Sequence, residues 1–168
     1  MIHGDWHRTS LDHPYAIVWM DDASRYIFSG GEFSEATAEH SIDTFQVVID
    51  QSRFFHAFIK DVNTDRGTQF HSNHPGSTSK FQELLKENDI NHIPSRRNNP
   101  QTNGKVERFW YEYDKHRWRF ETIDVFLQWY NHRLHGSLWL EIGENPSGAL
   151  MRKLDVGSLL GFFMELKI

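Results

Sequence analysis

Residues 65–70 read DRGTQF and residues 99–108 read NPQTNGKVER, and these two stretches decide the fold class of the chain. The first follows an apolar run that is typical of a buried strand, and the second leads into an amphipathic helical pattern. Each stretch carries one acidic residue, Asp65 or Glu107, and a third acid, Asp5, lies sixty positions upstream of Asp65. Carboxylates so far apart in the chain can meet only through the fold.

This spacing of Asp, Asp and Glu, with its flanking residues, resembles the catalytic core of DDE insertion-sequence transposases, which are retroviral-integrase-like proteins. The resemblance covers nearly the whole chain and extends to residues 129–138 (WYNHRLHGSL) and 145–149 (NPSGA). It implies a ribonuclease H-like fold, in which helices flank a mixed five-stranded sheet. Asp5 would lie on the first strand, Asp65 after the fourth, and Glu107 on a helix beside them.

The apolar patterns by themselves indicate an α/β sheet covered by helices, because strands alternate with helices and a helical second half follows. A strand over 56–62 would deliver Asp65 at its carboxyl end, where open α/β sheets bind ligands. A helix that begins after Thr102 or Asn103 would carry Glu107 at the border of its buried face. The other predicted elements are a hairpin of 15–20 and 26–30, a strand at 90–93, and helices near 35–52 (with Ser34 as a weak cap), 79–86, 122–134 and from 144–147.

The composition bounds the class of protein. With 168 residues, 38% of them hydrophobic, the chain can bury one good core, and it contains no cysteine for disulfides or thiolate metal sites. No apolar run approaches the roughly 20 residues of a membrane span, and no signal peptide is recognisable. We therefore expect a soluble, cytoplasmic protein without a membrane partner.

The two ends of the chain raise separate expectations. Residues 156–164 (VGSLLGFFM) are too apolar to hang free in water and too short to cross a bilayer. We expect an integrase-type catalytic core over 1–154 and an apolar tail over 155–168 that packs on the core or on a partner. Relatives carry an amino-terminal helix-turn-helix that recognises the element ends. We expect that domain, and specific end recognition, to be absent from this chain.

Three convergent carboxylates suit Mg²⁺ or Mn²⁺, which prefer hard oxygen ligands. Two such ions can activate the attacking oxygen and stabilise the leaving oxygen of a phosphodiester displacement. By the resemblance, Asp5 and Asp65 each hold metal, Asp5 bridges two ions, and Glu107 completes one site. The implied reactions are hydrolysis at the element ends and strand transfer of the freed 3′ hydroxyl into target DNA. Water or a DNA hydroxyl attacks, so no covalent protein intermediate is expected.

Any one of these acids taken singly is more commonly a turn residue or a solvated charge than a metal ligand. Asp5 is selected by its position upstream of the turn at 21–25 (DDASR), which serves as a landmark in the resemblance. Asp21 is the second choice for the first acid. Asp21 and Asp22 are otherwise expected to stabilise the turn.

The net charge of −5 disfavours a DNA partner, because phosphate binding usually needs a basic surface. Between Arg96 and Arg119, however, seven Lys or Arg face three acids, a local balance of +4. A charge run of this kind is also typical of a solvated surface. The candidate DNA contacts are Lys105, Asn103, Arg108 and Arg97.

Other assignments stay open at this point. His71 and His74 have a spacing that suits zinc, but no second pair accompanies them, so loop histidines are the simpler interpretation. A ribonuclease H-like nuclease without strand transfer would need the same three acids. A catalytically inactive DNA-binding remnant of a transposase would need only the fold. Because family members hold two DNA ends, we expect a homodimer or a higher homo-oligomer.

Overall fold

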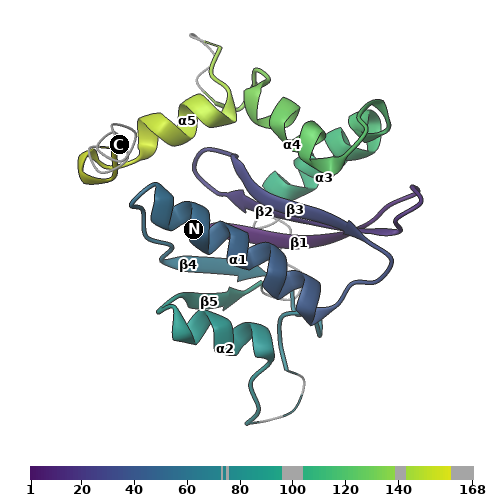
Figure 1. Ribbon diagram of the computed structural model, residues 1–168, viewed down its shortest axis with the longest axis vertical. Helices are drawn as coiled ribbons and strands as arrows, with labels where there is room; N and C mark the ends of the chain where they lie inside the picture. Colours follow the sequence, from purple (N-terminus) through teal and green to yellow (C-terminus); the bar gives the residue numbers. More distant parts are fainter. Residues whose placement is uncertain (73, 75, 96–103, 139–142, 160–168) are drawn as a thin grey trace.

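The computed structural model describes residues 1–72, 74, 76–95, 104–138 and 143–159. Five strands form one mixed sheet in the order β3-β2-β1-β4-β5 (Figure 1). The first three strands pair antiparallel, while β1, β4 and β5 run parallel. The strands are β1 (Ile2–Arg8), β2 (Tyr15–Asp21), β3 (Ile27–Phe33), β4 (Asp61–Thr64) and β5 (Asn91–Pro94).

Helices follow the strands and cover the sheet (Figure 1). Four of them start at a side-chain cap that satisfies a free backbone amide: Thr37, Ser79, Thr122 and Asn145. Pro146 begins the last full helix, after the cap residue Asn145. The helices are α1 (Ala38–Phe54), α2 (Lys80–Glu87), α3 (Gly104–His116), α4 (Ile123–His132) and α5 (Pro146–Lys153), with a 3₁₀ turn, η2 (Arg117–Arg119), after α3.

One face of the sheet packs against α1 and α2 around Trp19. Its indole is fully buried, stacks on Phe81 and donates a 2.9 Å hydrogen bond to Thr44 Oγ1. Gly4 on the neighbouring strand makes room for this ring, since a Cβ there would lie 2.0 Å from it. The remaining core residues on this face include Ile2, Ile17, Phe45, Val48, Ile49, Val62, Phe70 and Leu85.

The opposite face packs against α3 and α4. Four apolar side chains of α3 at helical spacing are buried here, together with partners from β2, β3 and α4. Those four positions are Val106, Phe109, Trp110 and Tyr113. The sheet therefore lies between two helical layers, as the sequence predicts. Within the described residues, no helix is both long and apolar enough to span a bilayer.

The expected strand over 56–62 is wrong in its first half. Helix α1 continues to Phe54, beyond the predicted end at 52, and the chain then turns with His56 at φ 49°. The Ala57 amide bonds back to the Ser52 carbonyl, and Phe58 is 98% exposed, so neither belongs to a buried strand. Strand β4 starts only at Asp61 but still ends directly before Asp65. Helix α1 also begins at Ala38, with Thr37 as its cap, rather than near Ser34.

Candidate active site

The register of the parallel pair β1 and β4 brings two of the predicted acids together. Gly4 pairs with Thr64, so Asp5 and Asp65 occupy the next positions on adjacent strands, which lie about 4.8 Å apart. Asp65 is exposed at the carboxyl end of β4, and its Oδ1 accepts a 2.9 Å hydrogen bond from the Gly67 amide. The chain thus turns away from the sheet immediately after this carboxylate.

Helix α3 lies over β1 and supplies the third acid. The Trp110 indole donates a 2.9 Å hydrogen bond to Asp5 Oδ2, which fixes the half-buried Asp5 carboxylate. One turn further on, Asp114 bonds to His7 at 2.9 Å, and the His7 ring stacks on Trp110. Glu107 is exposed in the first turn of α3 and lies one turn before Trp110. The contacts of this helix therefore hold Glu107 on the Asp5 side of the sheet.

The electrostatics of Asp5 connect all three acids. The pKa of Asp5 is raised to about 6, mainly by burial and also by the negative charges of Asp65 and Glu107, while the Trp110 hydrogen bond and His7 oppose the rise. The charges of Asp65 and Glu107 both raise the pKa of Asp5, so the three carboxylates lie near enough to influence one another. Like-charge crowding of this kind is common where a cation or a proton is needed for function.

The donor set fits a hard divalent cation, because it consists of three carboxylates with no sulfur or histidine required. In the described part of the chain, however, no three His, Cys, Asp or Glu side chains are gathered closely enough to hold an ion. Asp65 and Glu107 are both exposed at the surface. Their side chains would have to turn toward Asp5 to share a ligand with it.

The predicted DNA contacts have different surroundings. The amino group of Lys105 lies 2.7 Å from both carboxylate oxygens of Asp22, so it is engaged within the protein. Arg108 has a 65% exposed side chain, lies 3.4 Å from Glu112 and sits over the Tyr111 ring. Arg97 and Asn103 lie outside the described residues.

Two other candidate residues, Asp21 and His71, make ordinary structural contacts. Asp21 Oδ2 accepts hydrogen bonds from the amide and hydroxyl of Ser24, as expected of a residue that stabilises the turn. His71 Nδ1 bonds to the side chain of Gln82 in α2. Among the described residues, these histidines belong to no group that could hold a metal ion.

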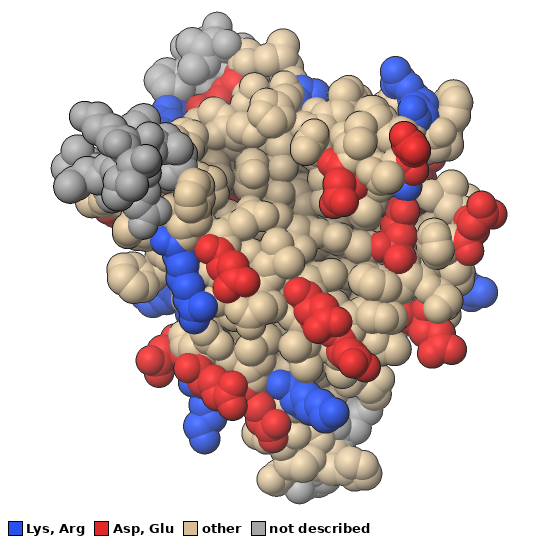
Figure 2. Space-filling view, viewed as in Figure 1, with Lys and Arg blue, Asp and Glu red and all other residues tan. Residues whose placement is uncertain are grey.

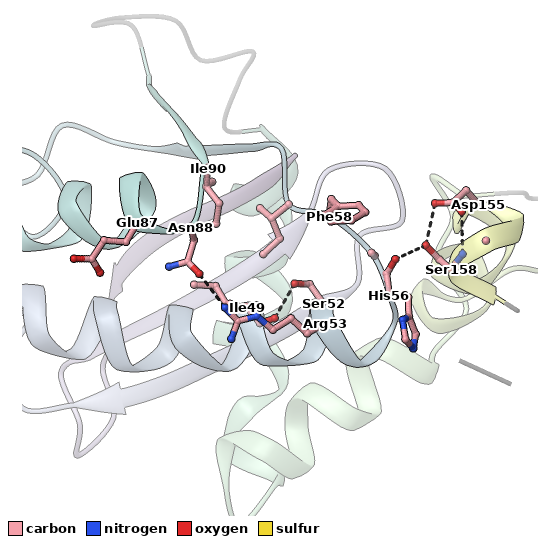
Figure 3. Close-up of a pocket in the computed structure, with 13 residues that line it drawn as sticks. Ile49, Ser52, Arg53, His56, Phe58, Glu87, Asn88, Ile90, Asp155 and Ser158 are labelled. Atoms are coloured by element: carbon pink, nitrogen blue, oxygen red, sulfur yellow. Dashed lines mark hydrogen bonds between the residues drawn. The ribbon is translucent and has the colours of Figure 1, made fainter. Parts of the chain in front are cut away.

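A groove of about 700 Å³ lies elsewhere, between the end of α1, the turn that follows it, and the end of α2 (Figure 3). Phe58 lies at this groove, and Ser158 closes one side by donating a 2.8 Å hydrogen bond to the His56 carbonyl. The acids at this groove are Glu87 and Asp155, and none of the three predicted catalytic acids lines it. The groove is therefore separate from the carboxylate site.

Sequence reasoning missed the polar residues that connect α3 to β1. Trp110 is buried, and its bond to Asp5 was not foreseen. Asp114 and Asp22 were likewise not expected to bind histidines of β1. The alternation of His3, Asp5 and His7 on one strand face was the available signal, since these side chains point to the same side.

A model of the integrase core domain matches residues 1–100, more than half of the chain. The chain belongs to the integrase core domain family. The matched segment includes Asp5 and Asp65 and ends before Glu107.

A curated relative is the predicted integrase ORF3 of Spiroplasma virus SpV1-C74. It is 26% identical over an alignment of 113 residues, and the match covers 63% of this chain and 31% of ORF3. The chain therefore spans about a third of the length of this relative.

Solved structures show the same fold. The catalytic core domain of BIV integrase superimposes with a TM-score of 0.59 at 17% identity, over 86% of this chain and 90% of that domain. A chain of the simian T-cell lymphotropic virus intasome, solved with the PP2A regulatory subunit B56 gamma, gives a TM-score of 0.59 at 18% identity. That match covers 86% of this chain and 52% of the other. The integrase core domain described here thus has the ribonuclease H-like fold that its sequence predicts.

Proposed function

We propose that this integrase core domain is the catalytic core of a metal-dependent DNA transposase or integrase. It would hydrolyse a phosphodiester at the ends of a mobile element and then join the freed 3′ hydroxyl to target DNA. The observation that carries the proposal is the placement of Asp5 and Asp65 at adjacent strands, with Glu107 on the helix that bonds to Asp5, in a domain of this family.

Asp5, Asp65 and Glu107 are the proposed catalytic residues and the proposed ligands of two Mg²⁺ or Mn²⁺ ions, with Asp5 shared between both. When bound, such ions activate the attacking oxygen and stabilise the leaving oxygen of an in-line displacement. The protein contributes the orientation of the carboxylates. The Trp110 indole orients Asp5 before any ligand binds, whereas the exposed side chain of Asp65, which accepts a bond from the Gly67 amide, would turn toward Asp5 on binding.

The charge distribution favours DNA on the α3 side of the domain. The face that α1 crosses carries scattered acidic side chains with single Lys or Arg residues between them, and no continuous basic patch (Figure 2). Glu39, Asp43 and Asp50 are exposed on α1. Helix α3 instead exposes Arg108 and Lys115 beside the aromatic Tyr111, a combination that suits a phosphate backbone with unpaired bases. We assign Arg108 to DNA binding, together with the predicted contacts Arg97 and Asn103.

A homodimer or higher homo-oligomer that holds two DNA ends completes the proposal. The likeness to a chain solved within an intasome supports an assembly of this kind.

The test is strand transfer of a pre-cleaved, labelled DNA end into plasmid in the presence of Mn²⁺. We expect the wild-type chain to give joined product, and Asp5→Asn, Asp65→Asn and Glu107→Gln each to lose at least a hundredfold of the rate. Asp21→Asn is the matched control, because Asn can still accept the Ser24 hydrogen bonds. Hydrolysis without joined product would assign the domain to the nucleases, and DNA binding without either reaction would make it an inactive remnant.

A further inference from the structure

The amino group of Lys105 contacts three oxygens of one acidic residue. Its Nζ lies 2.7 Å from Asp22 Oδ1, 2.7 Å from Asp22 Oδ2 and 3.3 Å from the Asp22 carbonyl oxygen. An ammonium group has three N–H donors, and three acceptors of a single residue lie within hydrogen-bond distance. The side chains of Lys105 and Asp22 are 37% and 28% exposed, so this multiple contact is partly shielded from water.

Asp22 in turn connects Lys105 to strand β1. His3 Nε2 lies 2.8 Å from Asp22 Oδ1, and the His3 side chain is only 4% exposed. The Asp22 amide also donates a 3.0 Å hydrogen bond to the Met1 carbonyl. One carboxylate thus joins the start of β1, the turn after β2 and the first turn of α3.

The two ends of this network lie close to the proposed catalytic acids along the chain. His3 is two residues before Asp5, and Lys105 is two residues before Glu107. Further along the same helix, Trp110 bonds to Asp5 and Asp114 bonds to His7. Helix α3 is therefore joined to the β1 side of the sheet at three positions along its length, Lys105, Trp110 and Asp114. Glu107 lies between the first two.

We propose that Lys105, Asp22 and His3 form a positioning network that holds the first turn of α3 and thereby sets the location of Glu107 relative to Asp5. This inference rests on the proposed function of Glu107. Lys105 then acts through Glu107 inside the protein and is not a phosphate contact.

The first turn of α3 needs such a tether for a physical reason. The first four amides of a helix have no intrahelical partner, and this helix starts at Gly104, a residue that lowers helix stability. Helix ends open locally more easily than helix centres. A displacement of about 1 Å in a catalytic group can cost on the order of a hundredfold in rate.

The test uses the whole chain and three variants. Lys105→Ala removes the network, and the exchange Asp22→Lys with Lys105→Asp restores an ion pair of reversed polarity. Lys115→Ala is the matched control, since it removes the same charge from the same helix, and Lys115 has no carboxylate partner at ion-pair distance among the described residues. The measurements are the strand-transfer rate at saturating DNA, the Kd for DNA as a function of salt, the Mn²⁺ affinity, and hydrogen exchange of the first-turn amides of α3.

We expect Lys105→Ala to lower the saturating rate and the Mn²⁺ affinity at least tenfold and to speed exchange in the first turn of α3. Exchange in α1 and the salt dependence of DNA binding should stay unchanged. The reversed pair should recover both rate and protection. Lys115→Ala should weaken DNA binding and reduce the slope of log Kd against log salt by about one, with normal exchange.

The proposal would be overturned if Lys105→Ala behaved like Lys115→Ala, or if the reversed pair restored neither rate nor protection. Failure of the proposed function would look different. The wild type would then give no joined product, while hydrogen exchange in the first turn of α3 would still report on the network.

Discussion

At the scale of single residues, Asp5 has the most informative surroundings. Its carboxylate is half-buried, accepts one hydrogen bond from Trp110 and experiences the charges of Asp65 and Glu107. Ionisation of a carboxylate in this position is unfavourable. It therefore lowers the stability of the folded domain whenever no cation is bound.

We expect Asp5→Asn to stabilise the metal-free domain. The pKa of Asp5 is raised to about 6 in the folded state, from an ordinary value near 4, so the folded protein binds this proton more tightly than the unfolded chain does. The ionised carboxylate therefore costs stability above pH ~6, and the cost disappears as the pH falls toward ~4. The gain from Asp5→Asn should be about 1–3 kcal/mol at pH 7.5 and close to zero at pH 4.

Thermal unfolding in EDTA at both pH values checks this expectation. Trp110→Phe is a useful comparison, because it removes the hydrogen bond that favours the ionised form and should lower stability at pH 7.5. An Asp5→Asn variant that is equally or less stable than the wild type at pH 7.5 would show that Asp5 is not under electrostatic stress.

The sequence indicated the three acids, but it did not predict the side-chain hydrogen bonds around them. The three acids could be chosen because their spacing and flanking residues resemble one family. The hydrogen bonds of Trp110, Asp22 and Asp114 depend on which side chains meet across β1 and α3. No local pattern contains that information, since the partners lie up to 107 positions apart.

At the scale of elements, β3 and the end of α3 are joined by a buried ion pair. Arg117 in η2 donates to both carboxylate oxygens of Glu32, at 2.7 and 2.8 Å, and the Tyr113 hydroxyl donates to the same carboxylate. The side chains of Glu32 and Arg117 are only 9% and 10% exposed. This contact fixes the far end of α3, as the Lys105 network fixes its start.

We expect Arg117→Met to destabilise the domain by about 3 kcal/mol, because Glu32 would remain buried without its cation. The double variant Glu32→Gln with Arg117→Met should recover much of this loss, since no uncompensated charge remains. Urea unfolding followed by tryptophan fluorescence measures both. Equal stability of Arg117→Met and wild type would show that the pair contributes nothing to the attachment of α3.

Most elements could be predicted because their apolar spacing is regular, as in α3 and α4. The exception was the segment after α1, where His56, Ala57 and Phe58 resemble a buried strand. The segment forms a turn instead, because the Ala57 amide bonds to the Ser52 carbonyl at the end of α1 and the positive φ of His56 redirects the chain. Composition alone does not distinguish an apolar turn from an apolar strand.

At the scale of the whole molecule, the two cores on either side of the sheet account for the fold, but the role of the tail stays a prediction. The described part of the tail ends near the groove beside Phe58, where Ser158 is buried and bonds to the His56 carbonyl. The sequence that follows is apolar and needs a surface to cover it.

Deleting residues 160–168 should therefore have a measurable cost. If the tail packs on its own core, the midpoint of thermal unfolding should fall by several degrees at unchanged molecular mass. If it packs on a second copy, the mass found by sedimentation should fall instead. Deletion without either change would contradict the expectation that the tail packs at all.

The central claim is that Asp5, Asp65 and Glu107 act as one divalent-metal site, and calorimetric titration with Mn²⁺ tests it most directly. We predict that the wild-type chain binds Mn²⁺ and that Asp5→Asn, Asp65→Asn and Glu107→Gln each weaken binding at least tenfold, whereas Asp21→Asn does not. Equal Mn²⁺ affinity in the wild type and all three carboxylate variants, or no binding by the wild type, would contradict the account.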